Sequence, residues 1–157
     1  MKKLITNEQV ISLAFGDGEY LSPEAVLDSD IVAATSRYII PVVGTELYEA
    51  LLNGSHTELL NDFIAPALAM AVRTMIQPAL NVRTGQLGLQ ISSTLRADSS
   101  TKTAMQTLQK SLRNRRQTLL KRLSNHLKNH ASEFAEYNPN NDAMQKCSID
   151  GGFVQIR

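Results

Sequence analysis

The chain has 157 residues, of which 43% are hydrophobic and 20% are charged, and its formal net charge is +1. A chain of this length can bury roughly 70% of its unfolded surface around one core, whereas two domains would each be marginally stable. No apolar run reaches the roughly 18 residues that cross a bilayer, and the start at Met1 leads into polar residues rather than an apolar signal core. We therefore expect one soluble domain that is neither exported nor bound to a membrane.

Scarce residue types exclude several kinds of site. Cys147 is the only cysteine, so no disulfide forms within the chain, and no positioned histidine marks it as a nucleophile. Trp is absent and aromatic residues make up 5% of the chain, which disfavours platforms that stack single-stranded bases.

Charge is distributed unevenly along the chain. The first 62 residues hold ten acidic and three basic side chains, whereas residues 101–132 hold eight basic side chains and no acidic one. Uniform mixing would serve solubility equally well, so this separation predicts assembly with a charged partner. The eight basic residues are Lys102, Lys110, Arg113, Arg115, Arg116, Lys121, Arg122 and Lys128.

The N-terminal third has the pattern of short helices. Thr6 and Gln9 form a capping box at the start of the first helix, which a Gly-Asp-Gly turn closes. Ser22 before Pro23 fits the N-cap and first turn of a second helix, whose apolar pattern continues until Pro41 stops it.

Two further signals divide the chain before its centre. Asp28 or Asp30 can split the second helix, since a short acidic side chain caps a helix start well. Thr45 can likewise cap a short helix that stops at Gly54.

The most apolar segment begins at Ser55 or Thr57. Its wide apolar stripe predicts the central core helix. Pro66 and Pro78 are expected to kink or restart this helix. The stripe consists of Leu59, Leu60, Phe63, Ile64, Leu68, Ala71, Val72, Met75 and Ile76.

The helical pattern breaks between Thr84 and Ser100. Apolar and polar residues alternate around Leu89, which predicts a short strand or hairpin near residues 85–96. Gly85 and Gly88 lack the Lys-Ser/Thr that a phosphate-binding loop needs, so they are interpreted as turn residues.

A long basic helix is expected from Ser99 or Ser100 until shortly before Pro139. One face is apolar and should dock on the core. The fold class is therefore mainly α, a small helical bundle with one long C-terminal basic helix and a minor β element. The apolar face consists of Met105, Leu108, Leu112, Leu119, Leu123, Leu127 and Phe134.

Lys110, Lys121 and Lys128 fall on the opposite face of this helix and are called the lysine ridge below. Long cations along one side of a rigid helix can follow the phosphates of double-stranded DNA without reading bases, or they can simply face solvent. Arg116 projects from within the apolar stripe, where an arginine snorkels or pairs with a carboxylate, including one on a neighbouring subunit.

His126 and His130 lie one turn apart, with Glu133 three residues later, a spacing that can hold zinc if a third ligand arrives. Leu127 stands where a metalloprotease motif needs its general base, so core or boundary histidines are favoured. The carboxylates of Asp28 and its neighbours are explained by helix capping. We expect no catalytic residue, metal or cofactor, and no enzyme activity.

The domain boundary is drawn at residue 137, with 138–157 as linker and tail. Phe153, Val154 and Ile156 are apolar and β-prone, and they are the candidates for contacts made by the tail. We predict that Gly152 to Arg157 adds as an edge strand to residues 89–95 of the same or a neighbouring subunit, or to a sheet of a partner. The alternative is a disordered terminus.

The string RYIIPVVGTELYEALLNG, at residues 37–54, extends a helix over 31–38 and precedes ELLNDFIAPALAMAV at 58–72. Together with the order of the other parts, these segments resemble prophage-encoded structural proteins related to the head-tail connector proteins of tailed bacteriophages. The resemblance covers most of the chain. It implies a mainly α adaptor whose copies form a ring under the portal, through which double-stranded DNA passes, with portal and tail proteins as partners. It also implies a place in the virion neck, after a stay in the bacterial cytoplasm, and no catalytic residues.

A ring needs head-to-tail contacts between unlike surfaces, and an acidic half facing a basic helix supplies them. We assign the lysine ridge to DNA or solvent. The arginines are assigned to subunit contacts, because arginine forms bidentate pairs with carboxylates. A small helical DNA-binding or protein-interaction module is the alternative, although Glu46 and Glu49 leave the 37–54 corner without a basic recognition helix. The subunit-contact candidates are Arg113, Arg115, Arg116 and Arg122.

Overall fold

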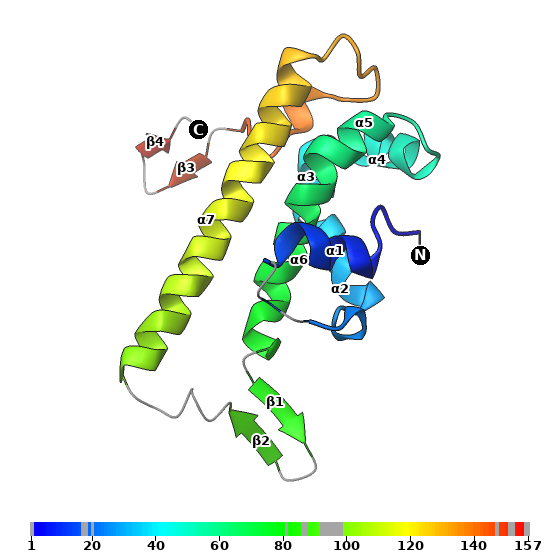
Figure 1. Cartoon of the computed structure of the whole chain (residues 1–157). Coiled ribbons are helices and arrows are strands. Elements are labelled where there is room, and N and C mark those ends of the chain that lie inside the picture. Colours follow the sequence, from blue (N-terminus) through cyan, green and yellow to red (C-terminus); the bar gives the residue numbers. More distant parts are fainter. Residues whose placement is uncertain are drawn as a thin grey trace.

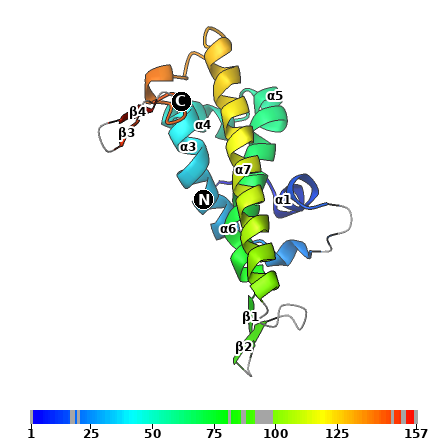
Figure 2. The ribbon, with the colours of Figure 1, turned by 90° about the vertical axis from the view of Figure 1, so that its left-hand side faces the viewer.

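Two long helices lie side by side at the centre of the computed structural model, which describes residues 2–16, 19, 21–80, 82–85, 88–91, 99–146, 148–150 and 153–155. Figure 1 shows α6 (Ala65–Leu80) alongside α7 (Ser99–Asn129), and the two helices contact each other. α1 (Asn7–Ala14) and α2 (Asp28–Ala34) pack on the other side of α6 (Figures 1 and 2). The predicted mainly α fold is confirmed.

α6 is the core helix that the apolar stripe predicts. Leu68, Met70 and Val72 have no exposed surface, and most of the helix is buried between its neighbours. Helix Thr57–Leu80 is long and apolar enough to cross a membrane by length and composition alone, but 67% of its most apolar window is buried inside the protein. Burial between packed helices accounts for this apolar character.

α7 docks through part of its expected face. Leu123 and Leu127 have no exposed surface and Leu112 is buried, whereas Leu108 is 39% exposed. The prediction for Leu108 is therefore wrong. Leu120, one residue from the expected stripe, is buried instead. The buried residues of α7 thus lie from Leu112 onward among the side chains that the structure describes.

α1 begins as predicted. The Thr6 side chain accepts a hydrogen bond from the Gln9 backbone N–H, and the Gln9 side chain accepts one from the Thr6 N–H. Ser22 makes no such bond, and only the short 3₁₀ helix η1 (Pro23–Ala25) follows it. α2 begins at Asp28, where the Asp30 carboxylate accepts from the Leu27 N–H. The split at Asp28 is confirmed.

Pro41, Pro66 and Pro78 all lie inside continuous helices, and the same device accommodates the first two. The helix from Asp28 runs through a π-helical turn, η2 (Thr35–Ile39), into α3 (Ile40–Val43), so Pro41 does not stop it. α5 (Thr57–Leu59) likewise continues through the π-helical turn η3 (Leu60–Ile64) into α6, where Pro66 is the second residue. Each π turn ends two residues before its proline. The wider turn relieves the clash between the proline ring and the preceding carbonyl.

Two glycines with positive φ end helices on either side of α4 (Thr45–Leu52). Gly44 has φ 84° and occupies the N-cap position, so Thr45 is the first helical residue and not the predicted cap. Gly54 has φ 88°, and its N–H bonds to the Leu51 carbonyl while Ser55 N–H bonds to the Ala50 carbonyl. This is the Schellman pattern, which glycine adopts without steric cost.

Short hairpins occupy two places in the chain. β1 (Val82–Gly85) pairs antiparallel with β2 (Gly88–Ile91), and β3 (Ser148–Asp150) pairs antiparallel with β4 (Phe153–Gln155). Residues 86, 87 and 92–98 of the expected β segment lie outside the described residues, as do Cys147 and Ile156. The predicted pairing of the tail with residues 89–91 is not made within one subunit, because β4 pairs with β3 in a sheet separate from that of β2, and residues 92–95 lie outside the described residues. Pairing neighbouring segments closes a much shorter loop and so costs less chain entropy.

Candidate functional site

The outer face of α7 carries a row of exposed cations. All three members of the lysine ridge are exposed, and Lys128 Nζ lies 3.4 Å from Gln145 Oε1. Arg116 differs from the other cations of α7 whose side chains are described, since it is half-buried. No acidic residue lies on this helix, so nothing along it neutralises the row. The exposed arginines and the remaining lysine are Arg113, Arg115, Arg122 and Lys102.

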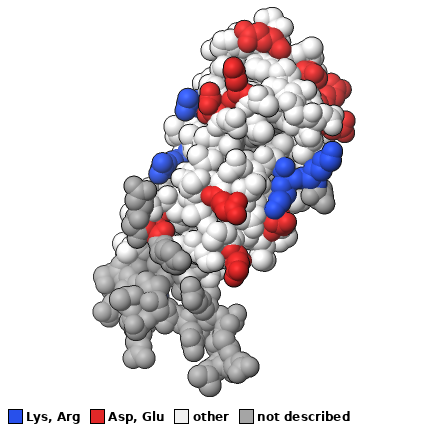
Figure 3. All heavy atoms as spheres, turned by 45° about the vertical axis from the view of Figure 1, so that its right-hand side comes forward, with Lys and Arg blue, Asp and Glu red and all other residues white. Residues whose placement is uncertain are grey.

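Exposed acidic side chains lie on several elements other than α7. Figure 3 shows them spread over the face that carries the N-terminal helices, whereas the cations visible there gather in a few places. Glu46 and Glu49 on α4 are exposed, as are Glu58 and Asp62 at the start of the central helix. Exposed cations therefore line α7, whereas exposed acidic side chains lie on α4 and at the start of the central helix.

A pocket of about 510 Å³ opens between α7, α6 and the turn η2. We call it the arginine pocket, since Arg37, Arg113 and Arg116 line it and no acidic residue does within the part of the chain that the structure describes. The Arg116 guanidinium carbon lies 4.2 Å from the centre of the Tyr38 ring, and that of Arg37 lies 5.5 Å from it. The remaining lining residues are Tyr38, Thr74, Met75 and Gln109.

Arg116 is held by an aromatic ring and not by a carboxylate. Stacking on Tyr38 satisfies the face of its guanidinium, but its buried Nε has no hydrogen-bond partner. The ion pair expected for this residue is therefore not made within the described part of the chain. Its side chain lines the arginine pocket.

Arg73 on α6, unlike Arg116, forms an ion pair within the chain. Its guanidinium donates to the Ala14 carbonyl and to Glu19, 2.6 Å away, and packs 4.5 Å from the centre of the Phe15 ring. Burial would raise the pKa of Glu19, but the Gly16 N–H and the Arg73 guanidinium outweigh it and lower this pKa. Arg73 thereby joins α6 to the end of α1.

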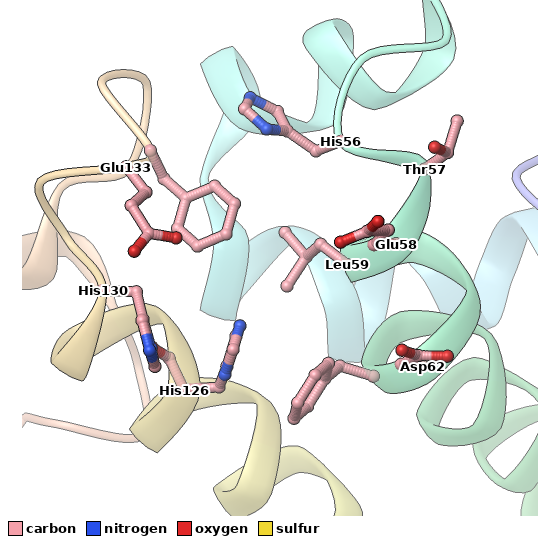
Figure 4. Close-up of a pocket in the computed structure, with 10 residues that line it drawn as sticks. His56, Thr57, Glu58, Leu59, Asp62, His126, His130 and Glu133 are labelled. Atoms are coloured by element: carbon pink, nitrogen blue, oxygen red, sulfur yellow. The ribbon is translucent and has the colours of Figure 1, made fainter.

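A second pocket, of about 660 Å³, lies between the start of α5 and the C-terminal end of α7. Figure 4 shows His126 and His130 on one side of it and His56 on the other. His126 stacks on Phe63 with ring centres 4.0 Å apart. Burial, with the nearby His130 and Arg122, lowers the pKa of His126, so its ring is neutral near pH 7.

The histidine spacing does not build a metal site. Within the residues described, no three His, Cys, Asp or Glu side chains are placed to share a metal ion. His130 Nδ1 lies 3.0 Å from the His126 carbonyl oxygen, and His56 lies 3.4 Å from Glu136. Glu133 is exposed. These imidazoles serve packing and helix-end contacts.

Three important residues carry weak signals in the sequence. Tyr38 stacks on Arg116, and Asp142 accepts a hydrogen bond from Ser124 Oγ at 2.6 Å. The two members of each pair lie far apart in the chain, so no local sequence pattern links them. His56 sits in a left-handed conformation, with φ 55°, between two helices. Only the apolar environment of the Arg116 position indicated that its side chain needs a partner.

The match to a family model covers the region that holds both pockets. A model described as a family of unknown function, DUF6712, matches residues 35–146, which is more than half of the chain. The chain belongs to the DUF6712 family. No curated protein and no solved structure matches it. The DUF6712 match begins at η2, two residues before Arg37, and ends after Gln145.

Proposed function

We propose that this DUF6712 protein is a non-enzymatic structural subunit of a phage or prophage head-tail junction. Its copies would form an adaptor ring that joins the portal to the tail and surrounds the passing double-stranded DNA. The subunit would assemble from the bacterial cytoplasm into the neck of the virion, without a cofactor or a membrane.

The observation that carries the proposal is the basic face of α7. Half of the 16 Lys and Arg residues of the chain lie on this helix, which has no acidic residue, and acidic side chains are spread over the face shown in Figure 3. A ring built from one kind of subunit needs two unlike, complementary surfaces on each copy. A charge-separated subunit meets that need.

The resemblance of residues 37–54 to connector-related proteins supports the same proposal. These residues form α3, the positive-φ Gly44 and α4, which is a corner between two helices. The minor β elements would serve contacts with neighbouring virion proteins, β4 through the edge that does not pair with β3. In this arrangement the lysine ridge faces the DNA, and it contributes affinity without sequence preference.

Coexpression with the portal protein encoded in the same gene cluster tests the proposal. We expect the portal to co-purify with several copies of the chain, and mass photometry to show one discrete complex. The lysine-ridge variant with all three lysines changed to glutamate should still join the complex, since the ridge is assigned to DNA. Failure to bind either the portal or the tail proteins of that cluster would overturn the proposal. Sequence-specific DNA binding would instead indicate the small DNA-binding module.

A further inference from the structure

The arginine pocket lies between three helical segments, and none of its described lining residues carries a negative charge. We infer that it receives acidic side chains of a second copy of this chain, presented by Glu46 and Glu49 on α4. This inference rests on the proposed function, because a closed ring requires each copy to bind the next through two different surfaces.

The pocket concentrates positive charge that the chain leaves unpaired. Arg37, Arg113 and Arg116 surround a space of about 510 Å³, and none of them forms an ion pair within the described residues. Arg113 and Arg116 are three residues apart on α7, so they are neighbours on the helix surface and repel each other. A bound carboxylate would turn this repulsion into attraction.

Arg116 is already held in a binding geometry. It stacks on Tyr38 at 4.2 Å, it is half-buried, and its Nε is buried without a hydrogen-bond partner. Because its Nε is buried, an acidic group that enters the pocket would bind the terminal Nη nitrogens, which can donate two parallel hydrogen bonds to a carboxylate. Little side-chain entropy remains to be lost when an acidic group binds.

The shape of the pocket favours a protein side chain over DNA. The space is concave, and half-buried Met75 forms part of its wall. A DNA duplex is stiff over a length of about 150 base pairs, so its phosphates contact ridges more readily than recesses. A flexible glutamate can enter the pocket and also place its methylene groups against Met75. The exposed lysine ridge is the better surface for a duplex.

α4 is the part of the chain best suited to fill the pocket of another copy. Glu46 and Glu49 are exposed, make no ion pair among the described residues, and lie three positions apart on one helix face. Figure 1 shows α4 on the other side of α6 from α7, so one copy does not fill its own pocket. This arrangement gives head-to-tail contacts.

Charge reversal on each surface, followed by mixing, tests the inference. The pocket variant carries Arg37→Glu and Arg113→Glu, two exposed positions, and keeps the stacked Arg116. The α4 variant carries Glu46→Lys and Glu49→Lys. In sedimentation velocity at low salt, the unchanged chain should self-associate, and each variant should associate at least about tenfold more weakly. An equimolar mixture should regain association, because each reversed surface then meets an opposite charge.

A matched control reverses another exposed acidic pair, Glu58→Lys with Asp62→Lys, which should leave self-association unchanged. Circular dichroism must show the same helix content in all variants. A mixture that stays monomeric overturns the inference, as does an unchanged chain that remains monomeric at the highest concentration. Loss of duplex DNA binding by the pocket variant, with self-association unaltered, would assign the pocket to DNA instead. None of these results decides whether the chain binds a portal, so the proposed function is tested separately.

Discussion

Replacing Asp142 should destabilise the protein more than replacing any other polar residue of its C-terminal segment. Asp142 has no exposed surface. Its carboxylate accepts hydrogen bonds from Ser124 Oγ at 2.6 Å, Tyr137 Oη at 2.8 Å and the Met144 N–H at 2.7 Å. These bonds join residues 137–144 to α7.

The geometry sets the magnitude of the effect of Asp142→Ala. A hydrogen bond to a charged group contributes about 1.5–3 kcal/mol, so three such bonds give a gross value of about 4.5–9 kcal/mol. Removing the carboxylate also removes the cost of burying it, and the freed donors regain some water, so we expect a net loss of about 3–5 kcal/mol. This is a large part of the 5–15 kcal/mol that is typical of a whole domain.

Urea denaturation followed by circular dichroism measures this loss. Tyr137→Phe deletes one of the three bonds and should cost about 1.5–3 kcal/mol. Burial and the bond to Asp142 raise the pKa of Tyr137, so this bond should persist into alkaline solution. Asn140→Ala, on the exposed 3₁₀ helix η5 (Pro139–Asn141), is the control and should change stability by less than about 0.5 kcal/mol. A loss below about 1 kcal/mol for Asp142→Ala would refute the assigned role.

Changing the three lysines of the ridge to glutamates should weaken the salt dependence of duplex DNA binding. The slope of log binding constant against log salt concentration should become shallower by about 2.7 or more. Reversing the exposed Lys2 and Lys146 is the control and should change this slope far less. An unchanged slope would remove DNA from the role of the ridge. The free energy of unfolding should fall as the pH drops below about 6.5, because unfolded His126 then binds a proton that the folded ring, with its lowered pKa, resists. His126→Gln should reduce this pH dependence in urea titrations, and an equal dependence in both proteins would contradict it. Deleting residues 152–157 removes β4 and should leave the thermal midpoint nearly unchanged while abolishing assembly with the portal, so normal assembly would refute a role for the tail.

Local signals predicted most of the helices, because their causes lie within a few residues of one another. The capping box at Thr6 needs only the Gln9 side chain, and the stop at Gly54 needs only a backbone that tolerates positive φ. The prediction that Pro41 stops its helix failed because it, too, considered only neighbouring residues. Proline is expected to end a helix because its ring clashes with a carbonyl of the preceding turn. Pro41 and Pro66 avoid this outcome because π turns that begin six residues earlier accommodate them.

The sequence by itself determined the helical class, the central apolar helix and the basic face of α7, since spacing along one helix decides which side chains share a face. Tertiary structure decided which of those side chains have partners. Tyr38 meets Arg116 and Asp142 meets Ser124 only because packing brings separate segments together. The free energy of a buried charge depends on whatever surrounds it in space, and sequence distance carries almost no information about that.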